Sequence, residues 1–361
     1  MTKKALKNTK SIEQYKKHQL KRKFFIFLIV SLIIGTSFFA LTVGASDISL
    51  NDVVALINNE AEDNVKNIIV DIRIPRTLAA LLGGMALAVA GAAMQSILRN
   101  PLGSPFTLGL SHAAAFGAAF AVIFLGAGSM HSDFSDAVLL NNANLVTLSA
   151  FLCSLISVSV ILLIAKYREA TPETMVLAGI ILGSLFTAGM NALQYIADDV
   201  ELAAIVFWTF GDVGKAVWND LPILAGIIIP AVIYFIWRAR SYNALDAGDE
   251  TAKSLGVCVN RLRIEGMLIA SLASAVVVSF FGIIAFIGLV VPHIVRKIIG
   301  GEEFYLLITS ALFGAFFLLL ADTVARTIIA PIVVPVGILT SFIGAPLFLY
   351  LLLYRSKRGY W

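Results

Sequence analysis

The chain has 361 residues, of which 59% are hydrophobic and 14% charged, and its net charge is +4. This composition excludes a soluble globular protein, in which about 25% of the residues are charged. It predicts an all-α polytopic membrane protein, because a helix satisfies its own backbone hydrogen bonds within lipid.

The first 23 residues form a basic segment that contains nine Lys or Arg and one Glu. The apolar run that follows reaches Val43 and ends without a small-residue cleavage site, so we expect a retained first span and not a removed signal peptide. We therefore divide the chain into a cytosolic segment 1–23, a single transmembrane domain 24–354 and a cytosolic tail 355–361.

Eight runs have the length of a membrane-crossing helix, which needs about 20 mostly apolar residues. They are Phe24–Val43, Leu78–Leu98, Phe106–Gly126, Leu145–Ala165, Met175–Ile196, Leu221–Trp237, Phe304–Arg326 and Val336–Tyr354. Several are rich in Gly and Ala, which indicates closely packed helices.

The uncharged run from Gly266 to Val295 is too long for one straight span and short for two, so its length leaves nine or ten spans open. A break near Gly282, with a shorter helix around Pro292, gives ten spans and places both termini in the cytosol. All but five of the 27 Lys and Arg then lie on the cytosolic side. The positive-inside rule therefore favours about ten transmembrane helices.

Three of the five exceptions, Arg73, Arg76 and Arg326, stand where an outer loop meets a span. Two interpretations remain open. The arginines could snorkel to the interface, or they could form a cationic rim that receives carboxylates of an acidic partner in bidentate geometry. Asp322 is spaced for a local helical ion pair with Arg326.

The longest polar interruption on the cytosolic side runs from Asn243 to Arg263. Its apolar positions follow a helical spacing, its charged positions lie on the other faces, and Gly256 is a natural stop. The apolar positions are Leu245, Ala252 and Leu255, and the charged ones are Asp249, Glu250 and Lys253. We predict two short helices joined at Gly256, either a solvated connector or a docking element for a cytosolic partner.

The chain has no sequence of its own that could supply energy or catalysis. No span shows convincing paired ionisable residues, and no Walker, HExxH or GxSxG motif is present, so an ion-driven secondary transporter or an intramembrane enzyme is not favoured. We expect no catalytic residue, and Cys153 and Cys258 form no metal-ligand cluster. Energy could enter through a separate ATPase at the docking element.

A few polar or polarizable residues are candidates for the translocation pathway, although such groups equally well hold helices together. They are Met190, Asn191 and Gln194 in the fifth span and Gln95 in the second. At the start of the fifth span, Thr171, Pro172 and Glu173 provide a helix entry with an acidic first turn. This segment could be a cap alone or also a gate.

Six motifs follow one another between about Arg73 and Arg355, and in this order they are specific. They are Arg73-Ile-Pro-Arg76-Thr-Leu, Asn100-Pro-Leu102, Gly248-Asp-Glu with Ser254-Leu-Gly-Val, Phe286 to Arg296, Ala321-Asp-Thr-Val-Ala-Arg326 and Pro335-Val-Gly337. With them the chain resembles the FecCD family of permeases, the membrane subunits of ATP-binding-cassette (ABC) importers for iron-siderophores, haem and cobalamin. It departs from the family pattern at Val333, where a Glu is usual, and at Gly103-Ser104.

The resemblance implies a cobalamin-permease-like bundle of ten spans and a dimer of permeases in the membrane lipid. It also implies two copies of a cytosolic ATPase that binds ATP and Mg, an extracytoplasmic substrate-binding protein, no cofactor in this chain and no nucleic acid partner. The implied roles are ATPase coupling for Asp249, Glu250, Ala252, Leu255 and Gly256, binding-protein docking for Arg73, Arg76 and Arg326, and a cytosolic gate at Thr171 to Thr174.

The expected function is therefore that of a permease subunit in the cell membrane, without ATPase activity of its own, that passes a metal chelate inward. Among substrates, an iron(III)-siderophore is expected first, and haem and cobalamin remain alternatives. The sequence does not choose among them.

Overall fold

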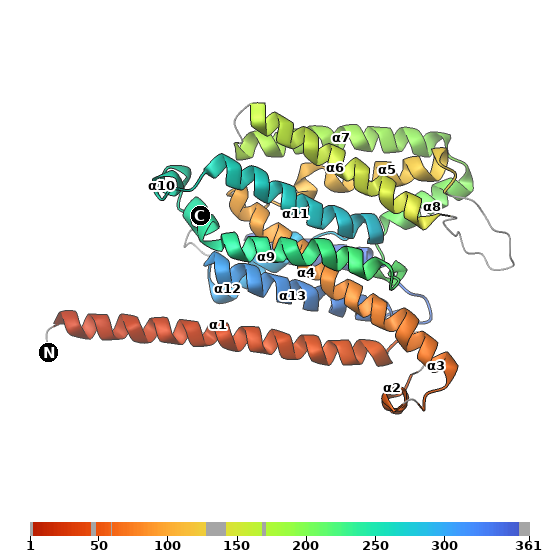
Figure 1. Ribbon diagram of the computed structural model, residues 1–361, viewed down its shortest axis with the longest axis horizontal. Helices are drawn as coiled ribbons and strands as arrows, with labels where there is room; N and C mark the ends of the chain where they lie inside the picture. The colour runs from red at the N-terminus through yellow and green to blue at the C-terminus, as the bar shows by residue number, and fades with distance from the viewer. Residues whose placement is uncertain (1–2, 45–47, 59, 128–141, 168–170, 354–361) are drawn as a thin grey trace.

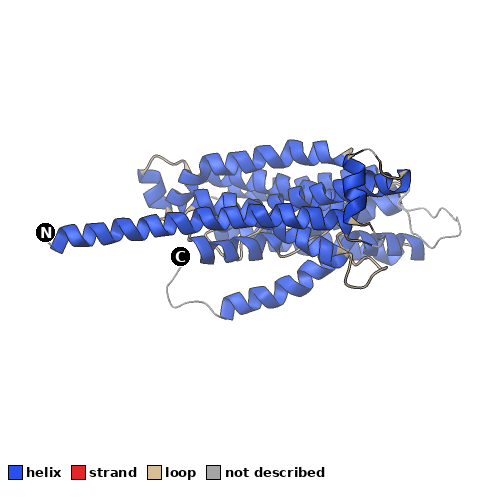
Figure 2. Ribbon diagram, turned by 90° about the horizontal axis from the view of Figure 1, so that it is seen from below, coloured by secondary structure: helices blue, strands red, loops and turns tan. Residues whose placement is uncertain are grey.

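The computed structural model describes residues 3–44, 48–58, 60–127, 142–167, 171–353, and every regular element in them is helical. Figure 2 shows the helices side by side along the long axis of the molecule. The elements are α1 Lys3–Thr42, α2 Leu50–Ile57, α3 Asp63–Asn67, η1 Ile68–Arg73, α4 Ile74–Ile97, η2 Pro105–Leu108, α5 Leu110–Phe124, α6 Ala143–Tyr167, α7 Pro172–Ile196, α8 Asp199–Thr209, η3 Val213–Lys215, α9 Asp220–Asp246, α10 Asp249–Ser254, α11 Val259–Phe281, α12 Ile287–Ile299, α13 Glu303–Ala325 and α14 Val336–Leu353. The tail 355–361 lies outside the described residues.

The predicted crossings are confirmed as helices. Seven helices are long and apolar enough to cross a membrane, and α5 and α14 are shorter apolar helices. The thirteen residues of α12 span only about 20 Å at 1.5 Å per residue, so α12 is the shorter helix that the sequence predicts around Pro292. Figure 1 places α10 at one end of the bundle and α2, α3 and α8 at the other, so we name these the α10 end and the α8 end.

The run from Gly266 to Val295 is broken where the sequence predicts it. Helix α11 stops at Gly282, whose φ of 78° lies in the left-handed region that suits glycine. Residues 282–286 are non-helical, and α12 begins after Phe286, also at positive φ. The break leaves backbone groups without helical partners. One of them is satisfied, because the carbonyl of Phe281 accepts a hydrogen bond from the N–H of Asp212 at 2.7 Å. The break therefore sits on the loop after α8 and not in open lipid.

The polar interruption at 243–263 differs in detail from the prediction. Helix α9 does not stop at Trp237 but continues to Asp246, because Tyr242 and Leu245 extend its buried face. A single short helix, α10, follows, and Gly256 at φ 80° turns the chain into the long helix α11. The second predicted short helix is thus the first turn of α11.

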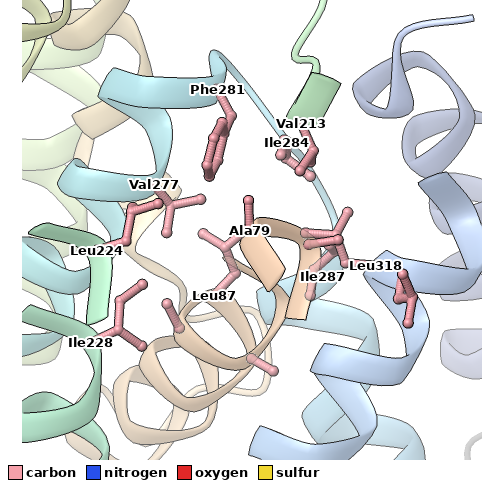
Figure 3. Close-up of a cluster of buried hydrophobic side chains, with 14 of the residues drawn as sticks. Ala79, Leu87, Val213, Leu224, Ile228, Val277, Phe281, Ile284, Ile287 and Leu318 are labelled. Carbon is pink, nitrogen blue, oxygen red and sulfur yellow. The ribbon is translucent and has the colours of Figure 1, made fainter. Parts of the chain in front are cut away.

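Helix α4 lies at the centre of the bundle. It packs against α13, α11, α9 and α12, and Figure 3 shows side chains of these neighbours, among them Leu224, Val277 and Leu318, gathered around Ala79 and Leu87 of α4. Two glycine pairs allow the closest approaches. A Cβ on Gly84 would collide with the carbonyl of Gly314 in α13, and a Cβ on Gly91 would collide with Gly288 in α12.

The first helix is fastened to the C-terminal half of the chain near its middle and at its C-terminal end. At the α10 end, Nε of Arg22 donates to the carbonyl of Ile299 at 3.0 Å, and the guanidinium also pairs with Glu302 and lies over the ring of Tyr305. His18 lies 3.1 Å from the same Ile299 carbonyl. At the α8 end, α1 meets arginines of α13 and η1. Although few of the described side chains of α1 are buried, these contacts fix the part of the helix from His18 to Thr42 in place.

Replacing Gly84 by Val should loosen the contact between α4 and α13. Overpacking of a tight interior site costs about 1–3 kcal/mol, and here the colliding atoms are backbone. We expect the detergent-solubilised variant to have a lower melting temperature, measured by fluorescence-detected size exclusion. The matched control is Gly226→Val in α9, where an added Cβ has no neighbour within 4 Å. Equal melting temperatures of the two variants would contradict the packing argument.

Candidate functional site

At the α8 end a buried ion pair joins α4 to α13. Nε of Arg76 lies 3.0 Å from Oδ2 of Asp322, and Nη2 lies 2.8 Å from Oδ1, so the pair is bidentate. Asp322 is completely buried and Arg76 nearly so. Asp212, in the loop after α8, approaches the same Nη2 at 3.4 Å. One guanidinium thus holds three separate parts of the chain together.

The other two arginines of the predicted rim bind the C-terminal end of α1. Nη1 of Arg73 donates to the carbonyl of Leu41 at 2.7 Å. Nη1 of Arg326 donates to the carbonyls of Ala40 and Val43 at 3.3 and 3.4 Å. The last carbonyls of a helix lack intrahelical partners and carry partial negative charge, so cations are favoured there.

Arg326 also forms the helical ion pair with Asp322 that the spacing predicts, at 3.3 Å between Nε and Oδ2. The guanidinium remains charged, as arginine does in proteins.

The three arginines therefore form one cluster, which we call the arginine cluster: Arg73, Arg76 and Arg326 together with Asp322 and Asp212. Each arginine is less than a tenth exposed. The structure brings the three predicted docking residues together, but as a buried network and not as freely exposed side chains at a rim. The i,i+4 spacing indicated the pair within α13, whereas nothing in the sequence pointed to the pairing of Arg76 with Asp322.

At the α10 end, helix α10 is anchored by a second bidentate pair. Nη1 and Nη2 of Arg263 lie 2.9 and 2.8 Å from the two carboxylate oxygens of Asp249, and Nε of Arg263 donates to the carbonyl of Ile97 at the end of α4. Ala252 is fully buried in the core, whereas Leu255 is 68% exposed. Asp249 and Ala252 thus fix α10, and Glu250, Leu255 and Gly256 lie on its exposed side.

The predicted gate segment lies beside this anchor. Thr171 caps α7 by accepting from the N–H of Thr174 at 3.3 Å, and Pro172 occupies the first turn. A pocket of about 330 Å³ separates α7 from α10. Its lining is Leu98, Arg99, Pro172, Glu173, Asp246, Asp249 and Arg263. The gate segment and the anchor of α10 therefore face one charged pocket.

A buried carboxylate at the same end escaped the sequence analysis. Glu303, the first residue of α13, is fully buried, and its Oε1 accepts from the hydroxyl of Ser96 at 2.9 Å. Arg296 of α12 lies 3.6 Å from the same oxygen. The sequence places Glu303 just before an apolar run, where a solvated first turn is the ordinary expectation, so only the tertiary contact with α4 reveals its burial.

The candidate pathway residues separate in space. Asn191 lines a groove of about 510 Å³ between α5 and α7, together with His112 and Thr187. Met190 packs partly buried against the core beside α5, and neither it nor Gln194 lines this groove. Gln95 is buried and donates to the carbonyl of Leu289 in α12 at 3.4 Å, so it joins two helices.

Replacing Asp322 by Asn should destabilise the protein strongly. The change leaves Arg326 buried without its carboxylate and Arg76 with only the more distant Asp212, and breaking one side of a buried pair costs about 3–5 kcal/mol. We expect a large fall in the melting temperature in detergent. The control is Asp71→Asn, because Asp71 is an exposed residue of η1. A variant at Asp322 that melts like this control would show that the ion pair contributes nothing to stability.

Comparison with known proteins agrees with this architecture. The model of the FecCD transport family matches residues 31–354. A protein of Methanocaldococcus jannaschii described as a candidate ABC transporter permease is 54% identical over 346 residues, which cover 96% of this chain and 99% of that protein. The hemin transport system permease of Yersinia pestis is 37% identical, with 93% and 96% covered. The Fe(3+)-citrate import system permease of Bacillus subtilis is 36% identical, with 92% and 96% covered.

A solved structure is similar as well. A chain of a candidate metal-chelate type ABC transporter, in an inward-facing conformation, superposes with a TM-score of 0.78 at 29% identity, covering 91% of this chain and 98% of that chain. The family model spans nearly all of the helical bundle, including both clusters described above. The chain therefore belongs to the FecCD transport family and is a multi-pass membrane permease of the ABC transporter type.

Proposed function

We propose that this permease moves a metal chelate into the cell and that a separate ATPase subunit, loaded with ATP and Mg, drives it through α10. The observation that carries the proposal is the geometry of α10. This short helix projects at one end of the bundle, its exposed face carries Glu250 and Leu255, and its buried face is held rigidly by Asp249 and Ala252. A rigidly held, exposed helix can transmit a push from a partner into the bundle.

The assembly follows from the same geometry. We propose two copies of the ATPase at the α10 end, which is then cytosolic together with both termini, and a second permease subunit in the membrane. Exposed apolar side chains along α7, such as Ile181 and Leu185, offer a surface for lipid or for that second subunit.

The arginine cluster is the proposed docking site for a substrate-binding protein at the α8 end. Arg76 is engaged in a bidentate pair with Asp322, so incoming carboxylates would join a preformed network instead of meeting isolated cations. Such a contact is electrostatic, and capture of the binding protein should weaken as salt rises.

For the substrate we propose an iron(III) chelate, an iron(III)-siderophore in the first place, with haem and cobalamin as alternatives. Support comes from the relatives, because the similar permeases of Yersinia pestis and Bacillus subtilis are named for hemin and Fe(3+)-citrate. The groove between α5 and α7 has mostly small and neutral lining residues, and such a wall would not select one chelate by charge.

The direct test is purification of the tagged chain from its native host in mild detergent, followed by reconstitution in vesicles. We expect an ATPase subunit to co-purify, and ATP hydrolysis to rise with one iron chelate and its loaded binding protein, less so at high salt. Iron(III)-hydroxamate, iron(III)-citrate, hemin and cobalamin are the probes. A chain that purifies alone and moves substrate under an ion gradient would reject the proposal in favour of a secondary transporter.

Replacing Glu250 by Lys should block uptake by the reconstituted complex while leaving the fold intact. Glu250 is exposed and makes no ion pair in the described structure. A like-charge contact in an interface costs several kcal/mol, which lowers the affinity for the partner by more than about tenfold. The assays measure substrate uptake and the amount of ATPase subunit that co-purifies with the permease. Asp249 is unsuitable for this test, because its reversal would also break the anchor with Arg263.

The matched control is Glu60→Lys, the same reversal at an exposed position of the α8 end. Uptake by the Glu250 variant equal to that of this control would remove α10 from the proposed ATPase contact.

A further inference from the structure

Arg99 occupies a backbone position that is normally reserved for glycine. It follows the C-cap Leu98 of α4 and has a φ of 45°. The N–H of Asn100 donates to the carbonyl of Gln95 at 3.0 Å, and the N–H of Arg99 donates to that of Ser96 at 3.2 Å. This pattern is a Schellman motif, whose left-handed residue is usually Gly, because other side chains are strained there. A strained arginine at this turn suggests that its side chain has a role.

The side chain of Arg99 stands between α10 and α7. Its Nη1 lies 3.7 Å from Oδ1 of Asp249, the first residue of α10, and the side chain is 43% exposed. It lines the pocket of about 330 Å³ together with Glu173, and also a neighbouring pocket of about 380 Å³ that Pro172 and Glu173 line from the other side. Arg99 therefore lies between the carboxylate of Asp249 on α10 and the carboxylate of Glu173 on the gate segment.

The two arginines at Asp249 are unequal partners. Arg263 is 5% exposed and bidentate at 2.8 and 2.9 Å, so it is a fixed anchor. Arg99 is half-exposed, and its contact with Asp249 is longer by almost an ångström. The remaining charges of the pocket are Asp246 and Glu173, both negative. A half-exposed cation among three carboxylates can exchange one partner for another without leaving its charge unpaired.

We propose that Arg99 is the positioning residue that links α10 to the gate. In the described arrangement it pairs with Asp249, and when the ATPase displaces α10 together with its Arg263 anchor it pairs with Glu173 instead, so that a movement of α10 repositions the start of α7. The inference rests on the proposed function, since it requires an ATP-driven movement of α10.

The test uses the reconstituted complex with its ATPase and binding protein, and measures ATP hydrolysis and substrate uptake separately. Arg99→Gln should retain hydrolysis and lose about tenfold in uptake per ATP, because α10 still binds the ATPase but no longer moves the gate. Arg99→Lys should keep part of the uptake. Arg99→Glu should be at least as defective as Arg99→Gln, because a carboxylate at this position can pair with neither Asp249 nor Glu173.

Arg99→Gly separates this role from a purely structural one. Glycine relieves the strain of the turn, so the variant should melt at or above the temperature of the wild type and still be uncoupled. Lys166→Gln, at an exposed site near the end of α6, is the matched loss of a positive charge and should leave the ratio of uptake to hydrolysis unchanged.

Two results would overturn the inference alone: normal uptake per ATP in Arg99→Gln, or normal uptake per ATP in Arg99→Glu. A wild-type complex without any ATP-dependent uptake would instead overturn the proposed function, and this inference with it.

Discussion

Basic side chains from distant segments hold the C-terminal ends of the helices in this bundle. The carbonyls that end a helix have no partner within it, and in a membrane protein they cannot all reach water. Here Arg326 donates to terminal carbonyls of α1, Arg263 donates to the terminal carbonyl of α4, and Arg22 donates to the terminal carbonyl of α12. Each contact joins residues far apart in the chain, so satisfying a helix end also fixes the neighbouring helix.

Each of these arginines is also paired with a carboxylate: Asp322, Asp249 and Glu302 respectively. A guanidinium removed from water needs such a partner, and the fork of donors allows it to serve a carbonyl and a carboxylate together. The pairing explains why the proposed functional sites coincide with structural clusters. Two of the three proposed docking arginines, Arg73 and Arg326, fasten α1, and the anchor of α10, Arg263, binds the terminal carbonyl of α4.

For a permease of the FecCD family this arrangement has a mechanical consequence. The central helix α4 reaches both clusters, with Arg76 near one end and the Ile97 carbonyl at the other. Its glycine contacts with α12 and α13 leave little room for bending. The proposed binding protein at the α8 end and the proposed ATPase at the α10 end would therefore act on opposite ends of one helix, and the half-exposed Arg99 follows directly after it.

The sequence by itself determined the class, the apolar helices, the break at Gly282 and the family motifs, because composition, span length and charge bias are local properties that do not depend on which helices pack together. The pair within α13 also follows from helical spacing. Only the tertiary structure decided that Arg76 meets Asp322, that Glu303 is buried beside Ser96 and that α9 extends to Asp246. These three features depend on which helices are neighbours, and the residues of one span do not indicate which other span packs against it.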